Sequence, residues 1–223
     1  MTEGQLLVVS GPSGSGKGTV VAFLKQMQGY AFSVSVTTRE PREGERDGVD
    51  YYYITKERFN EMRDAGELIE YTTFCNTSYG TPVSEVARAK TLERALVFDI
   101  ETEGAANIRK RFPDAILVML IPPTYAELEH RLRSRKTESE EKIANRLAKA
   151  KLEVPLFRNY DYVVINETGK QEEAAKILDA IVRARICQKQ GGPKTGEEKE
   201  LLAYVSAFET AKHPDTAKNF FQN

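Results

Sequence analysis

The sequence contains no tryptophan, only two cysteines and two histidines, and no apolar run long enough to cross a bilayer. The cysteines, Cys75 and Cys187, stand too far apart for a zinc-binding spacing and give no disulfide framework, which favours free thiols in a reducing compartment. The apolar stretch Leu6–Val9 is too short for a signal peptide, and Ser and Gly follow it. These absences predict a cytoplasmic protein.

Neither sign of charge is in excess, because 32 lysines and arginines balance 33 aspartates and glutamates and leave a net charge of -1. The composition gives no sign of the broad basic face that binds duplex nucleic acid, and we expect neither a nucleic acid nor a membrane as a partner. Hydrophobic residues make up 40% of the 223 residues, which is sufficient for one sizeable core.

Short apolar runs alternate with longer and more polar stretches of helical character. A charged segment with helical spacing follows each run, and the runs are Leu6–Ser10, Ala95–Ile100, Ala115–Ile121 and Tyr162–Ile165. Uninterrupted apolar strands that alternate with helices are typical of a parallel sheet buried on both faces. The sequence thus predicts an α/β fold with about five parallel strands flanked by helices. Residues 35–81 and 131–151 interrupt the alternation.

The first apolar run ends in a glycine-rich turn that fits the pattern G-x-x-x-x-G-K and opens a helical stretch. In this context glycines let backbone N–H groups turn towards phosphates, and the helix N-terminus adds a positive dipole. The lysine, Lys17, reaches the β- and γ-phosphate oxygens, so we also assign it a catalytic role. The ATP-binding residues predicted for this phosphate loop, or P-loop, are Gly11, Pro12, Ser13, Gly14, Ser15, Gly16, Lys17, Gly18 and Thr19.

Magnesium is the expected cofactor, because phosphoryl transfer from ATP needs its charge on the phosphates. The loop departs from the common pattern at Gly18, where Ser or Thr usually helps to hold the ion. Thr19 comes next, and it is the residue that we assign to the metal, directly or through water. The loop by itself leaves the phosphoryl acceptor open, since GTPases, ATPases and kinases all use it.

A run from Ser35 to Glu45, Ser-x-Thr-Thr-Arg-x-Pro-Arg-x-Gly-Glu, closely resembles the guanylate kinases. The resemblance spans nearly all of Leu6–Cys187, and the order of several motifs makes it far more specific than any one of them. It implies a P-loop kinase core with an inserted GMP-binding module of short strands and a helical lid. The further motifs are Asp50-Tyr51, Leu68–Tyr71, Ser78–Thr81, Asp99–Ala105, Arg135–Ser139, Arg146-Leu147 and Tyr160–Asn166.

Two fixed guanidinium groups suit a monophosphate dianion, and Arg39 and Arg42 stand on either side of Pro41, which stiffens the turn between them. Taken singly, paired arginines are more often surface charges, and tyrosines more often pack than bind ligands. Their joint order favours a binding role. The resemblance implies that both arginines, with Tyr51 and Tyr79, bind the phosphate of GMP, and that Arg39 is also catalytic.

Glu70 is the expected reader of guanine, because a carboxylate accepts hydrogen bonds from both N1–H and the exocyclic amino group. Adenine presents an acceptor at N1, so such a site rejects the wrong base strongly. The resemblance places Ser35 and Thr81 against the base as well. Asp99 and Glu101 end an apolar strand at the edge where α/β folds bind ligands, and we count both with the GMP site, near the guanine or the metal.

The charged segment 131–151 matches the lid of guanylate kinases, although a run of charge is by itself more often a solvated helix face. Arginines that arrive on lid closure stabilise transition-state charge and exclude water. The resemblance implies this catalytic role for Arg131, Arg135 and Arg146, and it places Asn166 near the adenine of ATP.

The resulting division has a guanylate kinase-like domain over residues 1–187, and a linker with an extension over residues 188–223. The extension lies outside the resemblance, and its apolar stripe predicts one amphipathic helix. Docking on the core is favoured for this helix over self-association and over binding of a partner. Within the domain, the core comprises residues 1–34, 82–130 and 152–187, the GMP-binding insertion residues 35–81, and the lid residues 131–151.

The expected reaction is Mg-dependent transfer of the γ-phosphate of ATP to GMP, which gives GDP and ADP in purine nucleotide metabolism. ATP and GMP are the small-molecule partners, and both a monomer and a homo-oligomer are open. One alternative is a kinase for another nucleotide, against which Glu70 and Ser35 argue. The other is a phosphopeptide-binding module, as in scaffolding proteins with guanylate-kinase-like domains, against which the intact Lys17 and the lid arginines argue.

Overall fold

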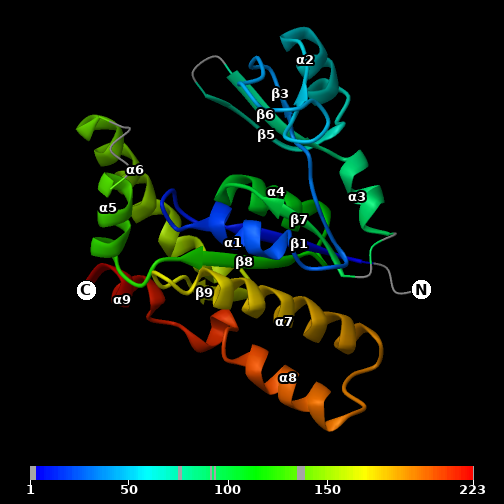
Figure 1. Ribbon diagram of the computed structural model, residues 1–223, viewed down its shortest axis with the longest axis vertical. Coiled ribbons are helices and arrows are strands. Elements are labelled where there is room, and N and C mark those ends of the chain that lie inside the picture. The colour runs from blue at the N-terminus through cyan, green and yellow to red at the C-terminus, as the bar shows by residue number, and fades with distance from the viewer. Residues whose placement is uncertain (1–3, 75–76, 91, 93, 135–138, 223) are drawn as a thin grey trace.

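A parallel five-stranded sheet forms the centre of the molecule (Figure 1). The computed structural model describes residues 4–74, 77–90, 92, 94–134 and 139–222. The strand order is β2-β7-β1-β8-β9, with every neighbouring pair parallel, which confirms the predicted core. β1 is the middle strand, with β7 on one side and β8 on the other. In open α/β sheets, ligands bind at the carboxyl end of such a central strand. The strands are β1 Gln5–Ser10, β2 Tyr30–Phe32, β7 Ala95–Asp99, β8 Ile116–Ile121 and β9 Tyr162–Ile165.

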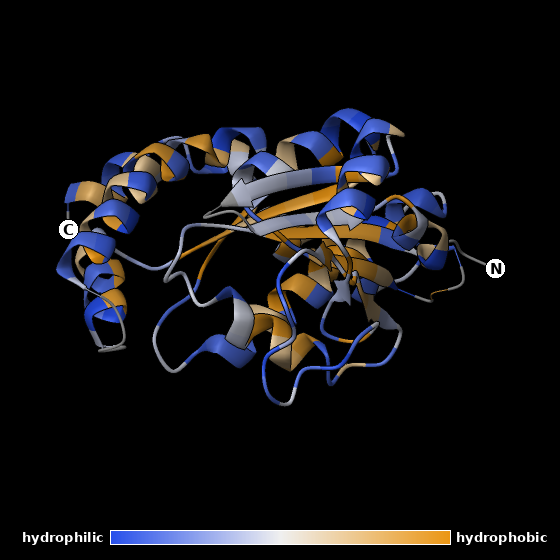
Figure 2. Ribbon diagram, turned by 90° about the horizontal axis from the view of Figure 1, so that it is seen from above, coloured by the Kyte–Doolittle hydropathy of each residue, from blue (hydrophilic) through white to orange (hydrophobic). Residues whose placement is uncertain are grey.

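Helices cover both faces of this sheet, because successive side chains of a buried strand point to opposite faces. Leu7 and Val9 of β1 pack with α1 (Lys17–Leu24) and α7 (Gln171–Lys189), whereas Val8 packs in the opposite layer. Figure 2 shows the apolar strands enclosed between the two layers. No helix in the described ranges is both long and apolar enough to cross a membrane. The opposite layer comprises α3 Ser84–Ala89, α4 Thr102–Arg111, α5 Tyr125–Ser134, α6 Glu140–Glu153 and the 3-10 helix η1 Val154–Asn159.

A second, smaller sheet stands above the central one (Figure 1), and it accounts for the segment that interrupts the α/β alternation. Its strand order is β4-β3-β6-β5, and Phe59 and Met62 of the helix α2 pack on it. Thr55 caps this helix by accepting a hydrogen bond from the Arg58 N–H. The elements of this small module are β3 Val36–Thr37, β4 Tyr52–Tyr53, α2 Lys56–Asp64, β5 Leu68–Phe74 and β6 Thr77–Pro82.

The chain passes between the core and the small module twice, and one buried carboxylate joins the two crossings. Glu85, at the start of α3, is 2% exposed and accepts the backbone N–H of Val34 at 2.9 Å. Arg88 pairs with the same carboxylate at 2.6 Å. Since a buried carboxylate needs such partners, this contact fixes where the small module leaves the core.

The C-terminal extension docks on the core, but it holds two helices, α8 (Gly196–Ser206) and α9 (Thr216–Gln222), where the sequence predicted one. The first helix stops because the next residues pair with the free edge of β9. The Val163 N–H donates to the Phe208 carbonyl, and the Thr210 N–H donates to the Asp161 carbonyl, each at 2.9 Å. This pairing covers the edge strand of the sheet.

Phe220 anchors the last helix, α9. Its side chain is 2% exposed, belongs to the same hydrophobic cluster as Val8 and Leu128, and meets the ring of Tyr125 edge to face at 6.2 Å. Since Tyr125 begins α5, the end of the chain supports the base of the two helices in the charged segment.

Replacing Phe220 by Ala should lower the free energy of unfolding by roughly 3–5 kcal/mol, because a fully buried aromatic ring is lost and a cavity is left. Urea unfolding measures the change. Phe221→Ala is the matched control, since this neighbouring ring is 38% exposed and should cost much less. Equal losses for the two variants would show that α9 does not depend on the buried ring.

Candidate active site

The phosphate loop joins β1 to α1 at the carboxyl end of the central strand. Gly11 and Gly16 have φ angles of 148° and 87°, which residues with a side chain rarely adopt. A Cβ atom at Gly11 would stand 2.0 Å from the carbonyl oxygen of Leu120, so only glycine lets the loop pass this close to β8. Residues Pro12 through Thr19 line a pocket of about 320 Å³ together with Asp99.

Lys17 and Asp99 set the charge of this pocket. The ammonium of Lys17 donates a hydrogen bond to the Gly11 carbonyl at 2.7 Å. Burial lowers the pKa of Lys17, and the negative charges of Asp99, Glu153 and Glu101 oppose this shift. Partial loss of water raises the pKa of Asp99, and the charge of Lys17 opposes it. A partly buried lysine at the start of a helix suits the phosphates of a nucleotide.

Asn166 and Arg131 hold the phosphate loop from behind. Asn166, fully buried after β9, donates from Nδ2 to the Ser15 carbonyl at 2.8 Å. Arg131 of α5 donates to the same carbonyl at 3.3 Å, to the Asn166 carbonyl at 2.8 Å and to Thr168 Oγ1 at 2.9 Å, and it pairs with Glu127 at 2.8 Å. In this structure Arg131 therefore positions the loop, and its expected contact with the transferring phosphoryl group stays a prediction.

Arg146 brings the second helix of the charged segment to the same loop. It lies on α6, which packs against α5 (Figure 1), and it donates from Nη1 to Ser13 Oγ. Arg135, the remaining arginine assigned to the lid, lies outside the described residues. Two of the three expected lid arginines are thus in contact with residues of the phosphate loop.

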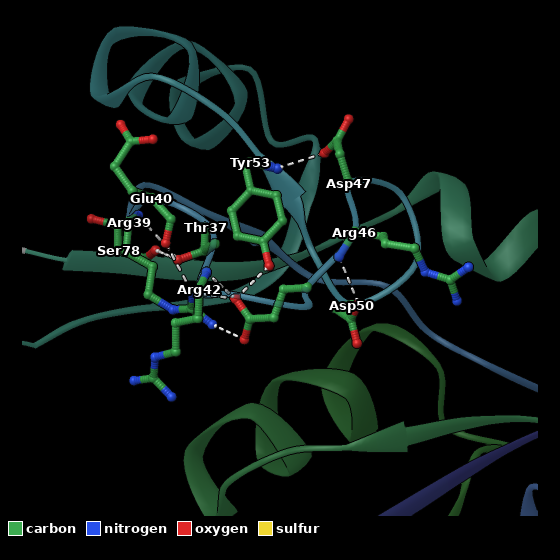
Figure 3. Close-up of polar contacts among 10 residues, drawn as sticks. Thr37, Arg39, Glu40, Arg42, Arg46, Asp47, Asp50, Tyr53 and Ser78 are labelled. Carbon is green, nitrogen blue, oxygen red and sulfur yellow. Dashed lines mark hydrogen bonds and ion pairs between the residues drawn. The ribbon is translucent and has the colours of Figure 1, made fainter.

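Glu45 organises the arginine–tyrosine cluster on the small module (Figure 3). It accepts hydrogen bonds from both Nη atoms of Arg39, at 2.6 and 2.7 Å, and from the Arg42 N–H and the Tyr53 hydroxyl, each at 2.8 Å. The hydrogen bonds from Arg39 lower the pKa of Glu45 to about 2. The two hydrogen bonds to Glu45 fix the side chain of Arg39 in place. Because a guanidinium has five N–H donors, Arg39 keeps others for a ligand.

Both tyrosines expected at the GMP phosphate lie beside Arg39. Its guanidinium carbon stands 5.0 Å from the ring centre of Tyr51, and the rings of Tyr51 and Tyr79 meet edge to face at 5.9 Å. The guanidinium of Arg42 extends away from Glu45 (Figure 3), so it is not part of the ion pair drawn there. The structure therefore gathers Arg39, Tyr51 and Tyr79, with Arg42 adjacent through its backbone.

Glu70 on β5 lies across from Thr81 on β6, and Thr81 Oγ1 donates to its Oε1 at 2.6 Å. Ser35 Oγ stands 3.3 Å from Thr81 Oγ1, so the three side chains form one polar group. A Cβ atom at Gly104 would lie 3.1 Å from Glu70 Oε2, which shows how closely α4 approaches the carboxylate. Burial raises the pKa of Glu70, and the hydrogen bond from Thr81 opposes this shift.

Glu101 faces a lysine that the sequence did not single out. The ammonium of Lys149, on α6, stands 2.6 Å from Glu101 Oε2 and 3.6 Å from the Oε1 atom of the nearly buried Glu153. The sequence contained a sign of both Lys149 and Glu153. They follow Arg146 at three and seven positions on a helix and so share its face. Glu45 had a comparable signal, an acid within the motif that holds both arginines.

The oxygen donors of the phosphate-loop pocket suit a magnesium ion. Thr19 offers a hydroxyl and Asp99 a carboxylate, and both line this pocket. At Gly18 a Cβ atom would meet nothing within 4 Å, so a hydroxyl side chain would fit there and the sequence provides none. Among the described residues, no three of the His, Cys, Asp and Glu side chains form a metal-binding group. A nucleotide-bound magnesium takes most of its ligands from phosphates and water.

A phosphate loop on the core, and a second cluster of arginines and tyrosines on a separate module, define the class of nucleoside monophosphate kinases. Comparisons with known proteins narrow this class. The family model described as guanylate kinase matches residues 3–185. The chain therefore belongs to the guanylate kinase family.

Named relatives support this assignment over most of the chain. The guanylate kinase of Shouchella clausii is 41% identical over 189 residues, which cover 84% of this chain and 91% of that protein. The guanylate kinase of Mesoplasma florum is 38% identical over 224 residues, 99% of this chain and 74% of that protein, so this match includes the extension. The crystal structure of guanylate kinase from Anaplasma phagocytophilum has a TM-score of 0.64 at 28% identity, and the match covers 94% of this chain and 98% of that one.

Replacing Glu45 by Gln should raise KM for GMP severalfold and leave KM for ATP unchanged, because Arg39 loses the charged partner that fixes it. Steady-state kinetics with each nucleotide varied in turn measures both constants. Glu40→Gln removes the same charge from the same turn and should change neither, since only the backbone carbonyl of Glu40 contacts Arg39 among the described contacts. An equal response of the two variants would contradict the organising role of Glu45.

Proposed function

We propose that this chain transfers the γ-phosphate of ATP to GMP, giving ADP and GDP, with ATP at the phosphate loop and GMP at the small module. The position of Glu70 is the observation that supports this assignment. Its carboxylate lies with Thr81 and Ser35 on the module that also holds the arginine–tyrosine cluster, so one module offers a base reader and a phosphate clamp. The family to which the chain belongs performs this reaction as part of purine nucleotide metabolism.

Guanine recognition rests on the acceptor oxygens of Glu70. Because Thr81 occupies Oε1 from one side, the remaining lone pairs accept N1–H and the exocyclic amino group of guanine. Ser35 and Thr81 contribute hydroxyls to the base, and Asp99 and Glu101 lie at the neighbouring strand end. An adenine would leave the partly buried carboxylate of Glu70 facing its N1 acceptor, which is costly.

The phosphate of GMP is held by Arg39, Arg42, Tyr51 and Tyr79. Glu45 keeps the guanidinium of Arg39 in one orientation, so little freedom is lost when the phosphate arrives. Held in this way, a phosphate oxygen of GMP points at the γ-phosphorus of ATP. Positioning of this kind supplies much of the rate of a direct transfer.

The donor half uses the loop from Gly11 to Thr19 for the phosphates of ATP, with Asn166 near its adenine. Lys17 neutralises the β- and γ-phosphate oxygens. Thr19 holds magnesium, with Asp99 in the same pocket, and the ion when bound neutralises further phosphate charge.

The helical hairpin over residues 131–151 acts as the lid, the small module over residues 35–81 as the GMP-binding part, and the remainder of residues 1–187 as the core. Arg131, Arg135 and Arg146 meet the charge of the moving phosphoryl group when the lid closes. The contact of Arg146 with Ser13 supports this assignment, because it brings the guanidinium to the donor loop. No covalent enzyme intermediate is needed for an in-line transfer.

Replacing Lys17 by Ala should lower turnover at least roughly a hundredfold while the fold stays intact, because the donor phosphates lose the charge that the transition state needs. A coupled assay of ADP release gives the rate, and urea unfolding confirms the fold. Near-normal turnover in a folded variant would remove Lys17 from the mechanism.

Replacing Glu70 by Gln should weaken GMP binding by roughly tenfold to a hundredfold and ATP binding hardly at all. The NH2 group of the glutamine side chain is itself a donor, so it cannot accept a hydrogen bond from the N1–H or amino group of guanine. The raised pKa of Glu70 adds a test on the unsubstituted chain. Acidification protonates this carboxylate at a higher pH than an ordinary glutamate, so KM for GMP should begin to rise there, and the variant should lack this dependence. Calorimetry with each nucleotide and KM against pH measure both effects, and equal losses for GMP and ATP would make Glu70 structural.

A further inference from the structure

Three charged residues on one face of α6 extend the active site beyond the arginines already assigned. Arg146, Lys149 and Glu153 are spaced three and four residues apart, which places them on the same side of the helix. Arg146 reaches the phosphate loop at Ser13, on the donor side. Lys149 reaches Glu101, just past the end of β7. One helix face therefore offers a cation to the donor loop and another to the strand end assigned to the acceptor.

The pairing of Lys149 is weak enough to be exchanged. Its side chain is 54% exposed and that of Glu101 is 68% exposed, and ion pairs in such surroundings contribute little to stability. Glu153, 8% exposed, stands 3.6 Å away and keeps the ammonium on the side of α6 that faces Glu101. A phosphoryl group carries more negative charge than one carboxylate, so it competes well for the same ammonium.

Glu101, the partner of Lys149, stands close to both halves of the site. Two residues before it, Asp99 lines the phosphate-loop pocket. Glu101 also directly precedes α4, and a Cβ atom at Gly104 in the first turn of this helix would lie 3.1 Å from Glu70 Oε2. An ammonium bound to Glu101 is therefore near both the donor loop and the acceptor module.

We propose that Lys149 is a further catalytic cation, which leaves Glu101 and contacts the phosphoryl group during its transfer; this proposal rests on the proposed function. In that step the bond from the γ-phosphorus to the bridging oxygen breaks, and its electron pair leaves with ADP. An oxygen of the GMP phosphate forms the new bond. The charges of reactants and products balance without a proton, so the ammonium acts by attraction alone. The same exchange frees Glu101 for the GMP that it is expected to bind.

The test compares Lys149→Gln with Lys176→Gln. Lys176 pairs with Glu172 on α7 at 2.8 Å, so the control removes the same charge from an exposed ion pair on another helix. We expect Lys149→Gln to lower kcat roughly tenfold to a hundredfold with both KM values nearly unchanged. Lys149→Arg should restore most of the rate, and Lys176→Gln should match the unsubstituted chain. If the unsubstituted chain fails to phosphorylate GMP, the proposed function is wrong. If it phosphorylates GMP and Lys149→Gln is equally active, only the catalytic role of Lys149 is wrong.

A bisubstrate ligand, adenosine and guanosine joined through a pentaphosphate, gives a readout apart from turnover because it fills both phosphate sites and the space between them. Calorimetry should show that Lys149→Gln weakens this ligand about tenfold or more while GMP alone binds as before. Unchanged affinity for the bisubstrate ligand would overturn the proposal. A loss for GMP alone as large as the loss for the bisubstrate ligand would also overturn it, since Lys149 would then act only on acceptor binding through Glu101.

Discussion

The close passage of the phosphate loop past β8 is the constraint on which the rest of the site depends. Only a glycine at position 11 allows this approach, and the loop is then fixed from behind through the carbonyl of Ser15, which accepts hydrogen bonds from Asn166 and Arg131. Through that one carbonyl, the edge strand β9 and the helix α5 are both tied to the loop. The C-terminal extension in turn covers β9 and supports α5 through Phe220, so every layer of the core contributes to holding the donor site.

The acceptor site is built on a separate small sheet, and this separation is what a two-substrate transfer needs. The small module has its own apolar core around Phe59, and it meets the central fold through two chain crossings that Glu85 joins. In the proposed function, Glu45 orients an arginine for the phosphate of GMP, and Glu70 presents a carboxylate to its base. A movement of this module relative to the core would carry both together.

The sequence predicted the parts of the molecule whose chemistry is local. Uninterrupted apolar runs revealed four of the five central strands but not β2, and the glycine pattern revealed the phosphate loop with Lys17. Contacts between distant segments were out of reach. Glu85 and Lys149 find their partners through the fold, and the backbone pairing of Phe208 with β9 ended a helix that the apolar stripe alone extended too far. Arg131 carried a family expectation, yet in this structure its guanidinium holds backbone carbonyls behind the loop.

We propose that one carboxylate, held by Thr81 on the small module, selects guanine for phosphorylation by ATP at the phosphate loop. The most direct measurement is ADP release from ATP and magnesium with GMP, AMP, CMP and UMP offered in turn as acceptors. We predict turnover with GMP, and a kcat/KM for AMP lower by at least roughly a hundredfold, because adenine leaves a partly buried carboxylate unpaired. Comparable turnover with AMP would contradict the reading of Glu70, and the absence of turnover with every acceptor in folded protein would contradict the transfer itself.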